Sequence, residues 1–72
     1  MNLKQIIAMD IPKGSPIEIN KGIEGIERVY YVGSNYNNSL GHDQIMFRRI
    51  KEGDICSYLL PYVNGIKKLK IS

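Results

Sequence analysis

The sequence predicts an all-β protein, a single small domain over residues 1–72 built as an antiparallel barrel of about five short strands with at most one short helical turn. Short apolar segments recur at a spacing of roughly 8–12 residues, and glycine, proline or asparagine separates them. The chain has 72 residues, enough for one small core. Closure into a barrel is expected because it removes sheet edges that so short a chain cannot otherwise cover.

Composition limits the class of protein. Apolar residues make up 43% of the chain and charged residues 24%, which is typical of a folded globular domain. The formal net charge of +3 permits binding to nucleic acid or to an acidic partner and requires neither. No apolar run reaches the ~18 residues of a membrane span, and no signal-peptide pattern is present. We therefore expect a cytoplasmic protein without a membrane partner.

The N-terminal segment, residues 2–11, shows two periodicities. Leu3 and Ile6 are spaced as on a helix, whereas the last residues of the segment alternate as in a strand. The choice stays open, with a short helical turn leading into a strand preferred. Residues 12–16 hold two prolines and a glycine, which end this element.

The middle of the chain predicts two strands before a long loop. Residues 17–19 alternate as a half-buried strand, and a turn follows at residues 20–22. Residues 26–32 carry apolar side chains on both faces, so we expect this strand at the centre of the sheet. Residues 33–43, rich in asparagine, serine and glycine, predict an 11-residue loop, which is long for a hairpin.

The second half predicts three further strands. Within residues 44–50, Ile50 is out of phase with the apolar residues before it, and a bulge at Arg48 and Arg49 would return it to the core. A hairpin turn is expected at residues 51–54 and another turn at residues 64–65. The remaining strands are predicted over residues 55–60 and 66–71.

Two segments resemble known families. Residues 60–63, Leu-Pro-Tyr-Val, are similar to the end of an SH3-like barrel, where a proline and a tyrosine lie in a short helical turn before the closing strand. This implies the topology and not the ligand, since the acidic loop and tryptophan that bind proline-rich peptides have no counterpart here. Residues 40–46 resemble the Gly-x-Asp-x-x-Met core of Sm-like RNA-binding rings, although Phe47 replaces the asparagine that contacts the base.

Basic residues concentrate on two predicted strands and are interleaved with tyrosines. Small barrels use this combination on single-stranded nucleic acid, where stacking contributes ~1–3 kcal/mol per base and cations neutralise phosphates. We therefore predict a non-enzymatic nucleic-acid-binding module, while the sequence leaves open whether the charges share one face. Lysines also protect sheet edges, and tyrosines also fill small cores. The candidates are Arg48, Arg49, Lys51, Lys67, Lys68 and Lys70 for phosphate, and Tyr30, Tyr31 or Tyr36 for stacking.

The predicted loop at residues 33–43 supports a second interpretation. Its asparagines and serines surround one aromatic residue, a composition found in adaptable binding loops. The chain would then be a protein-interaction module, a small accessory or inhibitory protein of phage type. Self-association, and an oligomer that sequesters a small nucleotide, are further alternatives, as is a loop without a partner. The candidate partner-binding residues are Tyr36, Asn35, Asn37, Asn38 and His42.

Catalytic chemistry has few candidate residues. Cys56 is the one thiol and His42 the one imidazole, and they would need to meet in space to form a nucleophile–base pair. The simpler reading makes Cys56 a small apolar group and Asp43 a turn-capping residue. With one cysteine and one histidine, and no calcium-loop or phosphate-loop motif, we expect no enzymatic activity, no metal and no cofactor.

Overall fold

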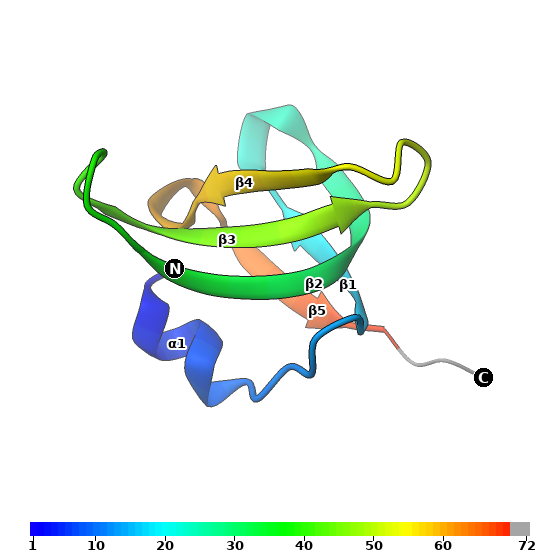
Figure 1. Cartoon of the computed structure of the whole chain (residues 1–72), viewed down its shortest axis with the longest axis horizontal. Coiled ribbons are helices and arrows are strands. Elements are labelled where there is room, and N and C mark those ends of the chain that lie inside the picture. Colours follow the sequence, from blue (N-terminus) through cyan, green and yellow to red (C-terminus); the bar gives the residue numbers. More distant parts are fainter. Residues whose placement is uncertain (70–72) are drawn as a thin grey trace.

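The computed structural model describes residues 1–69, which form one five-stranded antiparallel sheet with short helical segments (Figure 1). The prediction of an all-β protein with five strands is confirmed. The helix content exceeds the single turn that was predicted. In chain order the elements are α1 (Leu3–Ala8), β1 (Pro16–Asn20), the 3-10 turn η1 (Gly22–Glu24), β2 (Ile26–Asn37), β3 (His42–Arg49), β4 (Ile55–Leu59), the 3-10 turn η2 (Leu60–Tyr62) and β5 (Gly65–Lys68).

The strand order is β4-β3-β2-β1-β5, so β2 lies at the centre of the sheet, as its two apolar faces predicted. Each β-strand pairs with its neighbours in antiparallel orientation. Within residues 1–69 the sheet is not closed, because β4 and β5 are its two edges. The strand pairing therefore gives a curved, open sheet (Figure 1).

The core lies on one face of this sheet and is completed by α1 and η2. Alternate strand residues point into it, because successive side chains of a strand face opposite sides. The surface on the other side of the sheet is called the outer face below; on β1, β2, β3 and β5 it includes Glu18, Asn20, Ile26, Arg28, Tyr30, Arg48, Gly65 and Lys67. The buried core residues are Ile6, Ile17, Ile19, Val29, Tyr31, Ile45, Phe47, Leu60 and Val63.

Helix α1 decides the open choice at residues 2–11 in favour of the helix. The Asn2 side chain accepts a hydrogen bond from the Gln5 amide, and the Gln5 side chain accepts one from the Asn2 amide, both at 2.9 Å, which makes a capping box. Ile6 points into the core, and the Leu3 amide donates to the Asp43 carboxylate on β3 at 2.9 Å. The strand expected after the helix is absent from residues 9–11. No helix within residues 1–69 is long and apolar enough to cross a membrane.

The predicted loop at residues 33–43 is wrong. Strand β2 continues to Asn37 and β3 begins at His42, so only residues 38–41 connect them. Polar residues of the two strands contact one another through their side chains. Asn37 Nδ2 on β2 donates to Gln44 Oε1 on β3 at 3.0 Å, and Gln44 Nε2 donates to Asn35 Oδ1 on β2 at 2.9 Å. Side-chain amides thus support strand pairing in a segment whose composition indicated a loop.

The bulge lies in β2 and not at Arg48 and Arg49, so that prediction is also wrong. The β2–β3 register shifts between Tyr31 and Gly33. On β3 the chain turns directly after Arg49, whose carbonyl accepts from the Gly53 amide at 2.8 Å. Ile50 consequently lies in the turn with 51% of its surface exposed, outside the core.

Two isoleucine truncations test this packing. Ile45→Ala should lower the free energy of unfolding by about 2–5 kcal/mol, because it leaves a cavity under a fully buried side chain. Ile50→Ala should change it by less than about 0.5 kcal/mol, because Ile50 is exposed. Urea denaturation of both variants measures the difference. Equal losses would mean that Ile50 packs in the core, as the sequence pattern had indicated.

Candidate nucleic-acid interface

The register of the sheet gathers an aromatic ring and two arginines on the outer face. Tyr30 on β2 pairs with Arg48 on β3 and with Pro16 on β1. Directly paired residues project on the same face, and so do residues two apart on one strand, which adds Arg28. Tyr30 is 38% exposed, and both arginines are exposed. An accessible tyrosine is therefore flanked by two cations.

A row of charges continues from Arg28 across β1 to β5. Glu18 pairs with Arg28 on one side and with Lys67 on the other. Arg28 Nε lies 3.5 Å from Glu18 Oε1. The outward positions of the described strands thus carry three cations against one carboxylate. Sequence reasoning missed Arg28 as a candidate, although its phase with Tyr30 was a usable signal.

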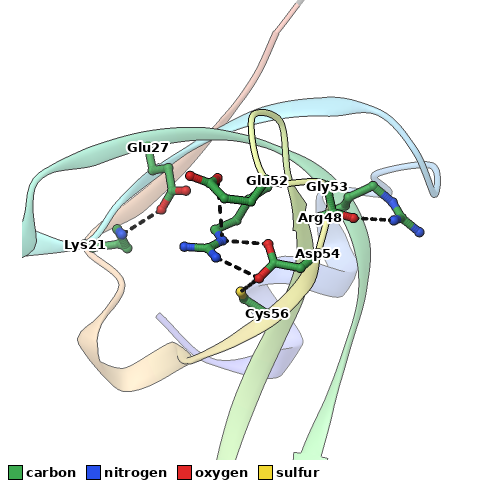
Figure 2. Close-up of polar contacts among 8 residues, drawn as sticks. Lys21, Glu27, Arg48, Glu52, Gly53, Asp54 and Cys56 are labelled. Atoms are coloured by element: carbon green, nitrogen blue, oxygen red, sulfur yellow. Dashed lines mark hydrogen bonds and ion pairs between the residues drawn. The ribbon is translucent and has the colours of Figure 1, made fainter.

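Arg48 and Arg49 separate because neighbouring strand residues face opposite sides. Arg49 pairs with the buried Val29 and binds Asp54 through Nε at 2.8 Å and Nη2 at 2.7 Å. Glu52 lies 3.7 Å from Arg49 Nε. Figure 2 shows Arg48 on the other side of the hairpin, where it donates to the Gly53 carbonyl at 2.6 Å.

The ion pair of Arg49 and Asp54 changes the titration of both groups. Hydrogen bonds from Arg49 hold the pKa of Asp54 below its ordinary value, and the same bonds raise the pKa of Arg49. The Cys56 thiol lies 3.8 Å from the same carboxylate (Figure 2). Two carboxylates compensate the charge of Arg49, which makes it a weak candidate for a phosphate contact.

The other predicted basic residues are spread over several surfaces. Lys51 is exposed in the β3–β4 turn, and Lys67 is exposed on the outer face. Lys68 pairs with the buried Ile17, and its ammonium donates to the Met9 carbonyl at 2.9 Å. Lys70 lies outside the described residues. The structure therefore places Arg48, Arg28 and Lys67 on the same face of the sheet, with β2 and β1 lying between the strands of Arg48 and Lys67, and it does not gather the whole predicted set there.

Tyr31 belongs to the core and offers no ring face for stacking. It is 9% exposed, and its hydroxyl lies 2.9 Å from the Ser34 hydroxyl. Strand alternation places it opposite to Tyr30, so two adjacent tyrosines take different roles.

The predicted partner-binding residues lie along the β2–β3 hairpin, which extends to the tip of the molecule (Figure 1). The side chains of Asn35 and Asn37 are occupied by Gln44, and Asn38 lies in the turn. His42 pairs with Asn37 and is exposed, and Tyr36 is 53% exposed. These residues form an ordered hairpin in place of the expected loop.

The structure does not bring Cys56 and His42 together. Cys56 pairs with Phe47, which is five residues along β3 from His42. At ~3.4 Å per strand residue, that separation is about 17 Å. Across residues 1–69, no group of three His, Cys, Asp or Glu side chains is placed to hold a metal ion.

Two concave regions lie near η1 and β5. A groove of about 460 Å³ is formed where η1 faces β4 and η2. There Tyr58 donates its hydroxyl proton to Glu24, which raises the pKa of Tyr58, and the Lys21 ammonium lies 5.8 Å from the Tyr58 ring centre. Lys21 is also bound to Glu27 at 2.7 Å (Figure 2). A smaller hollow of about 240 Å³ lies on the outer face beside Gly65.

Comparison with known proteins identifies no relative. No protein-family model matches the chain, and no match is found among curated proteins or solved structures.

The Arg49–Asp54 pair yields a prediction that separates the two arginines. Arg49→Gln should raise the pKa of Asp54 towards its ordinary value, because the Arg49 hydrogen bonds are the main cause of its lowering. Any stabilisation from this pair is present above the unfolded-state pKa of Asp54 and is lost as the pH falls through the lower folded-state pKa. A carboxyl-carbon NMR titration measures the change.

Arg48→Gln is the matched control for this titration. It removes the same charge one residue away, on the other side of the hairpin, and should leave the Asp54 pKa nearly unchanged. Equal shifts in the two variants would show that general charge, and not the Arg49 contact, sets this pKa.

Proposed function

We propose that this chain is a small non-enzymatic domain that binds single-stranded nucleic acid on its outer face. One observation carries the proposal: Tyr30 is accessible on the sheet face, with Arg48 directly across from it and Arg28 beside it. A tyrosine in this setting presents a surface for a base. Each guanidinium group has further N–H donors for a phosphate besides the contact of Arg48 with the Gly53 carbonyl and of Arg28 with Glu18.

The expected energetics follow from these side chains. One stacked base contributes ~1–3 kcal/mol, and each cation that neutralises a phosphate releases counterions. With Arg28, Arg48 and Lys67 as phosphate contacts, log K should fall with log salt at a slope of about −2, because each contact adds about −0.7 for a single strand. Binding is thus expected to be weak at physiological salt and clear at low salt.

The finer fold assignment is part of the same proposal. We place the domain among SH3-like barrels, with a partly open sheet. The strand order supports this, as does η2, which sets Pro61 and Tyr62 in a short helical turn directly before β5. We also propose a cytoplasmic location, where the free Cys56 stays reduced.

A charge and stacking series tests the proposal. Tyr30→Ala should weaken binding of a single-stranded oligonucleotide about tenfold, and Arg28→Gln and Arg48→Gln should each reduce the salt slope by about 0.7. Fluorescence anisotropy from about 50 to 200 mM salt gives both quantities.

Matched controls come from exposed residues away from this face. Tyr36→Ala removes an exposed tyrosine on the hairpin, and Lys4→Gln removes a cation on α1. Both should leave affinity and salt slope unchanged within error. If wild-type protein binds no DNA or RNA at low salt, or if the controls weaken binding as much as Tyr30→Ala, the proposal fails.

The hairpin supports a second candidate function, a protein-interaction module. The observation that favours it is that Tyr36 and Leu40 are exposed on a hairpin whose backbone is fixed by the amide contacts of Gln44. An ordered apolar pair loses little conformational entropy on binding, which favours a protein partner.

The two candidate functions predict opposite mutational patterns. Tyr36→Ala combined with Leu40→Ser should abolish cross-linking to a partner protein and leave oligonucleotide binding intact. Tyr30→Ala should do the reverse. Loss of both activities in the hairpin variant, with an unchanged thermal midpoint, would contradict separate surfaces.

A further inference from the structure

The two edges of the sheet differ in how they are protected against pairing with another strand. Within residues 1–69, β4 pairs only with β3, and β5 pairs only with β1. An edge strand offers unpaired N–H and C=O groups to other chains, and natural proteins protect such edges with lysine or proline. β5 carries Lys67 and Lys68, whereas β4 reads Ile-Cys-Ser-Tyr-Leu, without a charge or a proline. β4 is therefore the edge that can accept another strand.

The side chains of β4 on the outer face are uncovered. Ile55 pairs with Arg48 and so lies on the outer face, and Ser57 and Leu59 follow it on that face because they are two and four residues further along the strand. Ile55 is 56% exposed, and Ser57 is exposed. A strand added at this edge would cover an aliphatic side chain that one copy leaves in water.

The sequence of β4 suits antiparallel pairing with a second copy of itself. A two-fold axis through Ser57 sets residue 55 of one copy opposite residue 59 of the other, and residue 56 opposite residue 58. Every opposed pair is then uncharged, and Ile55 meets the aliphatic side chain of Leu59 on the outer face. The two Ser57 Cα atoms would lie about 4.5–5.5 Å apart, as directly opposed residues of antiparallel strands do.

The two ends of β4 carry opposite net charge, and the same two-fold axis brings unlike ends together. It sets the β3–β4 turn of one copy beside η2 and the larger groove of the other. The turn end has a net charge of +1, from three cations and two carboxylates: Arg48, Arg49, Lys51, Glu52 and Asp54. The groove end has a net charge of −1, from one cation and two carboxylates: Lys21, Glu24 and Glu27. Each end also presents an exposed apolar or aromatic side chain, Ile50 and Tyr62.

We infer that two copies of this chain associate through β4 as an antiparallel dimer with its two-fold axis at Ser57. The inference does not depend on the proposed nucleic-acid function. The same patch is used on both copies, so the contact closes at two chains. The apolar surface buried in this contact also stabilises a chain whose own core is small. The outer faces of the two copies become one continuous surface, because opposed residues of paired strands face the same side.

Sedimentation velocity over a dilution series tests the association. Wild-type protein should sediment as a reversible mixture of monomer and dimer. Ser57→Lys should raise the dissociation constant of the dimer about tenfold or more, because the two-fold axis sets the two new ammonium groups against each other. Ser39→Lys is the matched control: it makes the same substitution at an exposed position in the β2–β3 turn and should leave the dissociation constant unchanged.

A disulfide cross-link tests the register of the two strands. Cys56 is the one cysteine of the chain, so Cys56→Ala gives a background without a thiol. Adding Ser57→Cys places one thiol per copy at the two-fold axis, at a Cα spacing within the range of about 4.4–6.8 Å that a disulfide spans. Oxidised glutathione should then give a disulfide-linked dimer. Ser39→Cys in the same background should give no such dimer.

Each outcome supports or overturns the inference. A dimer that Ser57→Lys dissociates, Ser39→Lys retains and Ser57→Cys cross-links supports it. A monomer at every concentration overturns it, and so does a mass that grows beyond two copies, which indicates an open contact such as β4 on β5. A dimer that Ser57→Lys does not weaken, or that Ser57→Cys does not cross-link, also overturns it. These variants leave Tyr30, Arg28 and Arg48 in place, so the proposed function is tested separately.

Discussion

The phase shift in the middle of β2 is the constraint on which the rest of the fold depends. The strand pairs with β1 through its first residues and with β3 through its later ones, and it must supply inward side chains to both. Val29 and Tyr31 point into the core, and the shift after Tyr31 brings Ser34 into phase, within hydrogen-bonding distance of the Tyr31 hydroxyl. Without this register shift, Asn35 in place of Ser34 would face the core. A buried amide without a hydrogen-bond partner lowers the free energy of unfolding by about 1–3 kcal/mol.

Apolar periodicity in the sequence was enough to predict most of the strands and the central place of β2. It failed at residues 33–43 because the pairing there depends on amide contacts between Asn35, Asn37 and Gln44, which leave no apolar pattern. The bulge was misplaced for a related reason. In the sequence, Ile50 is out of phase with the apolar residues before it. This pattern is explained equally well by a bulge at Arg48 and Arg49 and by a turn that leaves Ile50 outside the core, as the structure shows.

The electrostatics of the candidate site could likewise be predicted only in part from the sequence. Arg48 and Arg49 form one basic pair in the sequence, but alternation sends one to the outer face and the other to Asp54. The number of charges in the sequence cannot show that Arg49 is already paired, because its partners Asp54 and Glu52 reach it only through the fold of the β3–β4 turn. The alternation of side chains along a strand could have identified Arg28 as a candidate. Arg28 and Tyr30 lie two residues apart on β2 and therefore face the same side of the sheet.

Gly65 is a strand position where the outer face can change independently of the core. Most residues that shape a binding surface also support a fold, so changing them costs stability, whereas a side chain at Gly65 would extend into open space from a strand position without left-handed backbone geometry. Substitutions there can alter the shape and polarity of the outer face while the core on the opposite face stays the same. This position can therefore be varied, in evolution or in a library, to change the outer surface of the domain.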